Sequence, residues 1–190
     1  MRFKVINENE MTDAQRAVYA EICAGPRGRR GPPGTRGTDL LTRCPELAKH
    51  AQKVGEYLRY RSTLPQRIME LAILITARYW SAQYEWHAHY PIALKAGLSA
   101  VTIADLAHGR RPEGMKDDEA AAYQFCTELH RDKKVGDAAF DAALRHFGEA
   151  GVVDLMGAAG YYTLISMALN VNQTPVPDGV PLPLPLPPLG

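Results

Sequence analysis

The sequence predicts an all-α protein of about six to eight helices in a single domain. Two observations support this fold class. Apolar residues recur at helical spacing along most of the chain, and no segment alternates apolar and polar residues as a half-buried strand would. Residues that commonly bound helices also stand where the apolar pattern starts and stops: Thr12, Ser99 and Asp137 before a segment, Gly109 and Gly148 after one.

The N-terminal part predicts one helix followed by one loop. Thr12 can cap a helix over Asp13–Ala24, which a glycine–proline pair then ends. The next stretch, Gly25–Gly37, is rich in glycine, proline and arginine, which indicates an exposed loop. This loop either is simply solvated or forms a lid whose arginines pair with a substrate carboxylate, with Arg30 as the candidate for that contact.

The central stretch, Arg67–Ser99, would hold Glu70 and Glu85 about 22 Å apart if it were one straight helix. Ser81 is a good N-cap residue, so we expect a break there and two helices that pack against each other. Such packing would bring Glu70 towards Glu85 and His89. The helices expected after the first one span about 45–61, 65–79, 82–96, 100–107, 116–131, 138–147 and 151–169.

The last residues are proline-rich and cannot form a helix, which predicts an extended, polyproline-like conformation. We therefore divide the chain into a helical domain, residues 1–176, and an arm, residues 177–190. The leucines of the arm, Leu182, Leu184 and Leu186, would suit a groove on a neighbouring subunit, so we expect an arm exchanged between subunits.

The composition is that of an ordinary globular protein, with 46% apolar and 23% charged residues among 190. The net charge of +1, without a block of one sign, does not indicate binding to nucleic acid or to a membrane surface. Glu70, Arg78 and Glu85 interrupt the longest apolar run, so no transmembrane helix is expected. The N-terminus lacks the apolar segment of a signal peptide, which predicts a cytoplasmic protein.

Three side chains in the centre have the chemistry of an acid–base site. Glu85 and His89 are four residues apart and share one helix face, and a carboxylate beside an imidazole favours the imidazolium. Glu70 lies in an apolar segment, where a carboxylate is costly unless it is paired or functional. The alternative for Glu70 is a structural ion pair with Arg67 or Arg78.

Metal and cofactor binding are not expected. His87 and His89 are two positions apart on a helix, so their side chains diverge by about 200°, which is poor geometry for a shared metal ion. For the same reason we expect His87 to be structural. The cysteines are far apart and form no CxxC pair, which argues against a zinc site or a disulfide framework.

The central residues resemble the carboxymuconolactone decarboxylase family, in the branch of the AhpD-like fold that lacks redox thiols. The resemblance spans about residues 12–176 and implies an orthogonal helical bundle that assembles as a homo-oligomer (dimer, trimer or hexamer). Its motif consists of Leu64–Pro65, Glu70–Leu71, Ala77–Arg78, Tyr84–Trp86, His89, Ala93 and Gly97–Ser99.

In the thiol branch of this fold, a glutamate precedes a CxxC motif, and a histidine follows the second cysteine by four residues. By position, the glutamate corresponds to Glu70 and the histidine to His89, whereas the cysteines are replaced by Ala82 and Glu85. The resemblance therefore implies proton transfer rather than thiol redox chemistry, because the nucleophile is absent.

The resemblance also implies a carboxy-lyase that acts on a small carboxylated or lactone substrate. His89 would be the general acid or base, and Glu70 or Glu85 would orient it or relay protons. Two alternatives stay open: a peroxide-related protein of the same fold, and a helical oligomer without catalysis. An open cavity that reaches Glu70 and His89 would favour the enzyme. The residues expected to hold the substrate are Arg78, Tyr84 and Arg30.

Overall fold

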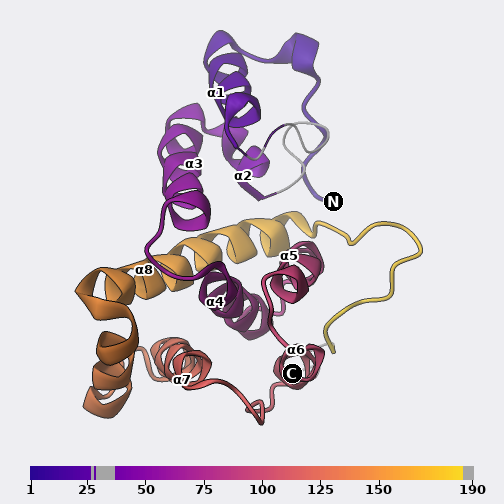
Figure 1. The fold of residues 1–190 in the computed structure, drawn as a ribbon. Coiled ribbons are helices and arrows are strands. Elements are labelled where there is room, and N and C mark those ends of the chain that lie inside the picture. Colours follow the sequence, from indigo (N-terminus) through magenta and orange to yellow (C-terminus); the bar gives the residue numbers. More distant parts are fainter. Residues whose placement is uncertain (27, 29–36, 186–190) are drawn as a thin grey trace.

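The computed structural model describes residues 1–26, 28 and 37–185, and within these residues every regular element is a helix (Figure 1). The all-α prediction is thus confirmed. In chain order the elements are η1 (Glu8–Glu10), α1 (Asp13–Ala24), α2 (Gly37–Leu40), η2 (Leu41–Arg43), α3 (Pro45–Tyr60), α4 (Gln66–Tyr79), α5 (Gln83–Lys95), α6 (Ala100–Ala107), α7 (Asp117–Asp132) and α8 (Asp137–Asn172).

Helix α4 lies at the centre of the core because it is apolar on all sides. Every residue from Ile68 to Ala77 is buried, and α5, α7 and α8 all pack against it. A helix that is apolar all round has no face that favours water, so it is stable only inside. Within this run Glu70 is the one carboxylate, and it is 1% exposed.

The break between α4 and α5 falls where the sequence predicts it, but Ser81 produces it in a different way from the one expected. Ser81 does not cap α5; it adopts a left-handed conformation (φ 49°) that turns the chain, and Ala82 precedes the first turn. Side-chain bonds to α8 hold the turn: the indole of Trp80 donates to Thr163 (3.0 Å), and Asn170 donates to the carbonyl of Trp80 (2.7 Å). The turn folds α5 back against α4.

Besides Ser81, three caps were predicted, and two of these three form. The side chains of Thr12 and Ser99 each accept a backbone hydrogen bond three residues later, at 3.2 and 2.9 Å. Asp137 was expected to cap α8, but it is the first helical residue, and Gly136 precedes it without a side-chain cap. A carboxylate in the first turn still interacts favourably with the helix dipole.

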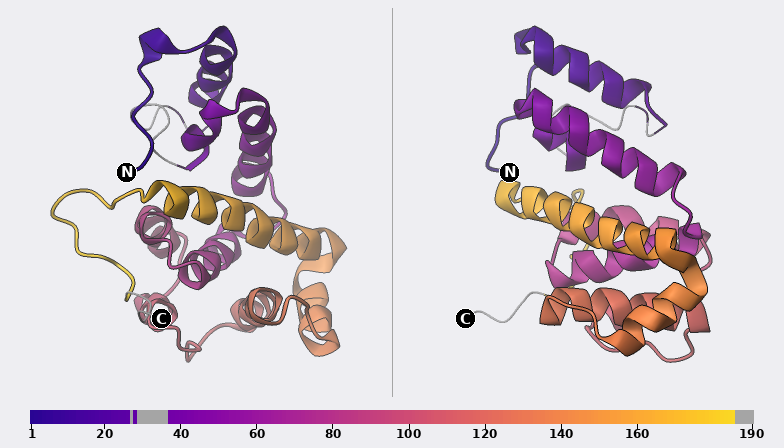
Figure 2. Two further views of the ribbon diagram at one scale, coloured as in Figure 1. Left: turned by 180° about the vertical axis from the view of Figure 1, so that it is seen from behind. Right: turned by 90° about the vertical axis from the view of Figure 1, so that its left-hand side faces the viewer.

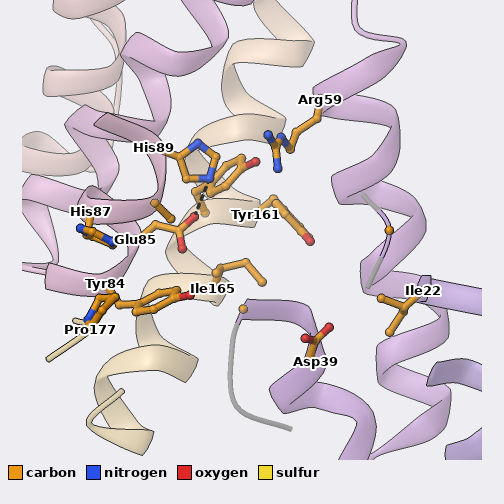
Figure 3. A pocket seen from close by; sticks show the side chains of 14 residues that line it. Ile22, Asp39, Arg59, Tyr84, Glu85, His87, His89, Tyr161, Ile165 and Pro177 are labelled. Carbon is orange, nitrogen blue, oxygen red and sulfur yellow. Dashed lines mark ion pairs between the residues drawn. The ribbon is translucent and has the colours of Figure 1, made fainter. Parts of the chain in front are cut away.

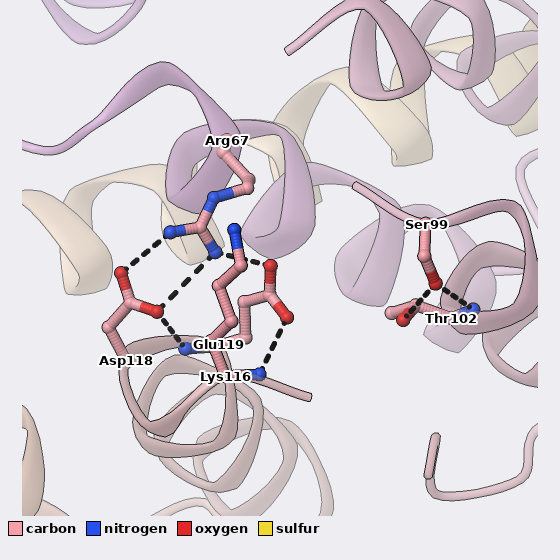
Figure 4. Close-up of polar contacts among 6 residues, drawn as sticks. All are labelled: Arg67, Ser99, Thr102, Lys116, Asp118 and Glu119. Atoms are coloured by element: carbon pink, nitrogen blue, oxygen red, sulfur yellow. Dashed lines mark hydrogen bonds and ion pairs between the residues drawn. The ribbon is translucent and has the colours of Figure 1, made fainter. Parts of the chain in front are cut away.

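The two ion-pair alternatives for Glu70 are wrong. Arg67 instead pairs with Asp118 (2.8 Å) and Glu119 at the start of α7 (Figure 4). Glu119 also accepts from the backbone N–H of Lys116 (2.9 Å) and so caps α7. Arg78, the other arginine of α4, does not pair with Glu70 either. Its side chain donates to the carbonyl of Ala107 at the end of α6.

The part of α8 that follows its kink at Gly148 separates the molecule into two layers (Figures 1 and 2). Helices α1, α2 and α3 lie on one side of it, and α4 to α7 lie on the other. By length and hydropathy alone α8 could cross a membrane, contrary to our expectation from the sequence, but half of its apolar window is buried inside the protein. A core helix meets the same criteria.

A kink at Gly148 divides α8 where two separate helices were predicted. Gly148 has φ 67° and no neighbour that a methyl group would meet, so Gly148→Ala is expected to lower the free energy of unfolding by about 1–2 kcal/mol through backbone strain alone. Gly160→Ala is the matched control, since Gly160 also faces open space but is helical; it should raise stability by about 0.5–1 kcal/mol. Urea denaturation measures both, and equal effects would refute the argument.

The C-terminal segment forms no helix over residues 173–185, as predicted, and it contacts its own chain. Leu184 is 2% exposed and joins the core, and Gln83 in α5 forms two hydrogen bonds with its backbone, each 3.0 Å. Leu182 is exposed, and Leu186 lies outside the described residues. Leu184 thus fills a groove of its own chain, and the exchange of the arm between subunits stays a prediction.

Candidate active site

Folding α5 back on α4 brings Glu70 and His89 together. The Nδ1–H group of His89 donates to Oε2 of Glu70 across 2.7 Å. His89 is 5% exposed, so water competes little for this contact. The ring also packs edge-on against Tyr162 of α8, with centroids 5.3 Å apart, which limits its rotation.

Glu85 completes the arrangement from within α5. Its Oε1 lies 3.2 Å from Nε2 of His89, one helical turn away, and it is as deeply buried as the histidine. The imidazole therefore lies between two carboxylates, one on each ring nitrogen. We call Glu70, His89 and Glu85 the Glu–His–Glu cluster.

The cluster holds the imidazole in its charged form. Burial by itself lowers the pKa of His89, but the charges and hydrogen bonds of Glu70 and Glu85 outweigh it and raise that pKa from 6.5 to about 9. At neutral pH His89 is thus an imidazolium that donates both of its N–H groups. Such a group holds a proton ready for transfer to Glu85.

A cavity of about 410 Å³ opens beside the cluster (Figure 3). Glu85 and His89 are part of its wall, whereas Glu70 lies behind them and does not line it. The wall is built from both layers of the molecule and from the C-terminal segment. The lining residues are Ile22, Gly28, Gly37, Asp39, Arg59, Tyr84, Glu85, His87, Ala88, His89, Tyr161, Tyr162, Ile165 and Pro177.

The residues predicted to hold a substrate have different positions. Tyr84 lines the cavity, as expected for a substrate contact. Arg78 does not, because its Nε donates to the carbonyl of Ala107 (2.9 Å) at the end of α6. Arg30 lies outside the described residues. His87 was expected to be structural, but it lines the cavity near Tyr84 (Figure 3).

The central helices match a known family. The sequence profile of the carboxymuconolactone decarboxylase family covers residues 45–128, which include the whole Glu–His–Glu cluster. Over these residues, which make up less than half of the chain, the sequence is similar to the carboxymuconolactone decarboxylase family. The resemblance inferred from the sequence is thereby confirmed for residues 45–128.

A solved structure shows the same fold. A crystal structure of a protein of unknown function from Agrobacterium tumefaciens, for which an AhpD antioxidant defence role has been suggested, superposes with a TM-score of 0.65. It is 18% identical, and the match covers 73% of this chain and 95% of that one. At this identity the likeness concerns the AhpD-like fold alone. A search of curated proteins found no significant match.

The match to the carboxymuconolactone decarboxylase family leaves out much of the cavity wall. Residues before α3, among them Ile22 and Asp39, lie outside the matched region, and so do Tyr161 and Tyr162 of α8. The family motif thus supplies the acid–base groups, while the remaining chain shapes the space in front of them.

Sequence reasoning missed Arg59, a cavity residue inside the matched region. It lies near the end of α3 and reaches into the cavity on the His89 side (Figure 3). Nothing in its sequence context distinguishes it from the neighbouring Arg61, because both follow the polar pattern of a surface helix. Only the packing of α3 across α8 shows that Arg59, and not Arg61, lines the cavity.

The described residues place no thiol at this site. None of the described lining residues is a cysteine, and Cys126 lies in the core, where burial raises the pKa of its thiol to about 12. The described residues also contain no set of three or more His, Cys, Asp or Glu side chains arranged to hold a metal ion.

Proposed function

We propose that this protein is an acid–base enzyme, of the carboxy-lyase type, that transfers a proton to carbon in a small carboxylated or lactone substrate. The observation that carries the proposal is the buried imidazolium of His89, held between two carboxylates at the wall of a cavity. Burying three ionisable groups is costly unless they serve a function or are fully paired. Here the cavity gives two of them access to a ligand.

The geometry divides the work between the two carboxylates. Glu70 bonds Nδ1 of His89 away from the cavity, so it is a positioning residue that fixes the ring and supports its positive charge. Glu85 bonds Nε2 and lines the cavity, so it can pass a proton between His89 and a ligand. The pair then behaves as one acid–base unit.

Decarboxylation would use this unit in two steps. The bond between the substrate carbon and its carboxylate breaks, CO2 leaves, and the electron pair moves into an adjacent carbonyl to form an enolate. His89 then gives its Nε2 proton to Glu85, and Glu85 protonates the carbon. Water later returns one proton to the cluster, so each turnover consumes one proton and releases one CO2.

A panel of carboxylated lactones and β-keto acids tests the proposal. In D2O the protein should release CO2 and place one deuterium on the carbon that lost it, as observed by NMR. Glu85→Gln should lower kcat by about 100-fold or more, because an amide cannot pass the proton. Glu46→Gln, at an exposed carboxylate, serves as the control. Undiminished turnover in Glu85→Gln would contradict the proposed role.

A further inference from the structure

We propose that Arg59 is the anion-binding residue of the cavity and holds a substrate carboxylate that survives the reaction; this inference rests on the function proposed above. Arg59 is half-buried and lines the same cavity as Glu85 and His89. It makes no hydrogen bond or ion pair within the described part of the chain. Its one contact of note is with the ring of the adjacent Tyr60, 5.5 Å from the guanidinium.

The other half-buried arginines in the described residues all have protein acceptors. Arg67 pairs with two carboxylates of α7. Arg78 donates to the carbonyl of Ala107, and Arg43 donates to the carbonyls of Leu40 and Lys4. A partly desolvated guanidinium without an acceptor is unfavourable, because its donors lose water and gain nothing. Arg59 thus differs from its peers in the way a ligand-binding group would.

The charges around the cavity point the same way. The imidazolium of His89 is already balanced by Glu70 and Glu85. Glu85 and Asp39 place negative charge on the wall, which disfavours an unpaired anion nearby. Among the described lining residues, Arg59 is therefore the cation left for an incoming carboxylate. A guanidinium suits this role because it donates to both carboxylate oxygens at once.

Arg59 would not bind the carboxylate that leaves as CO2. An ion pair stabilises a carboxylate in its charged form, and decarboxylation must remove that charge, so pairing there would raise the barrier. The group held at Arg59 is consequently retained in the product. The reacting carbon then faces Glu85, and the two ends of the substrate are recognised by different residues.

The cavity volume limits the size of such a ligand. A volume of about 410 Å³ corresponds to about 14 water molecules at about 30 Å³ each. Adipate, with about 10 non-hydrogen atoms, fits this volume and offers a carboxylate at each end. Adipamide has nearly the same shape and no charge, so the two compounds separate charge recognition from shape.

Isothermal titration calorimetry at pH 7 and low salt tests the inference with both probes. Wild-type protein should bind adipate at least 10-fold more tightly than adipamide. Arg59→Met should weaken adipate binding by about 10–100-fold and leave adipamide binding unchanged. Arg59→Lys should fall between them, because the ammonium keeps the charge but loses the two-pronged geometry. Arg61→Met is the matched control, since Arg61, the residue that follows α3, is exposed and pairs with Glu56 of that helix.

Three outcomes would overturn the inference: wild-type protein that does not bind adipate at millimolar concentration, Arg59→Met that binds adipate as wild type does, or Arg59→Met that loses both probes equally. Adipamide binding by Arg59→Met also shows that the variant is folded. The titration needs no turnover, so it is separate from the test of Glu85. If adipate binding depends on Arg59 but no compound of the lactone and β-keto acid panel loses CO2, the proposed reaction is overturned and the Arg59 site stands.

Discussion

Replacing His89 with glutamine is expected to lower turnover by about 10²–10⁴-fold, the range over which a positioned acid or base acts. A glutamine amide can still donate a hydrogen bond to Glu85, but it cannot release a proton. Binding of the uncharged probe adipamide should change little, because the side chain keeps its volume. Steady-state kinetics on a substrate from the lactone and β-keto acid panel, with calorimetry beside it, measures both effects.

The pH dependence identifies the same residue independently. His89 must be protonated to donate, so wild-type kcat should fall as the pH rises through about 9, the pKa of His89 in the folded protein. The glutamine variant should lack that limb of the profile. His108→Gln, an exposed histidine that bonds the carbonyl of Ala104, is the control and should keep both rate and profile. If His87→Gln loses this limb of the profile and the His89 variant keeps it, the acid is His87 and the assignment to His89 is wrong.

Replacing Glu70 with alanine should lower the free energy of unfolding by about 3–5 kcal/mol at pH 6–7, because it leaves the buried imidazolium of His89 with one partner in place of two. Urea denaturation at several pH values measures this. The matched control is Glu46→Ala, which removes the carboxylate from the exposed Glu46–His50 pair. That pair has the same residue types at 3.1 Å, yet it should contribute less than about 1 kcal/mol because water screens it.

The pH dependence of this loss follows from the pKa of His89. That pKa is about 9 in the folded protein, against an ordinary 6.5, so proton binding stabilises the fold fully below pH 6.5 and the stabilisation disappears as the pH rises through 9. The deficit of Glu70→Ala should therefore be largest near pH 6 and shrink above pH 9. A deficit that is independent of pH would show that packing, and not the charge of His89, accounts for it.

The centre of the fold could be predicted from the sequence because its signals are local. The apolar run of α4 specifies a buried helix, and the chain turns at Trp80–Ser81 where the pattern is interrupted. Once that turn is placed, α5 folds back against α4, and this packing brings Glu70 and His89 together. The spacing of Glu85 and His89 is fixed by the helix itself.

The rest of the cavity could not be predicted because distant segments build it. Arg59 enters from α3 and Tyr161 from α8, and no local pattern records that these helices cross beside α5. His87 was assigned to another face of α5, and it does diverge from His89. The cavity reaches both histidines because the N-terminal layer and Pro177 enclose more than one side of that helix. The role predicted for Arg30 stays a prediction.

The anchoring of the C-terminal segment has a consequence for the synthesis of the protein. Leu184 fills a place in the core, and Asn172 at the end of α8 receives backbone hydrogen bonds from Arg2 and Phe3 at the beginning of the chain. Chains emerge from the ribosome in order, at about 5–20 residues per second. The contacts of Arg2 and Phe3 with Asn172 therefore cannot form until α8 has been synthesised. The contact of α5 with Leu184 likewise cannot form until the C-terminal segment has been made. Until then the newly made protein leaves this apolar surface exposed to solvent.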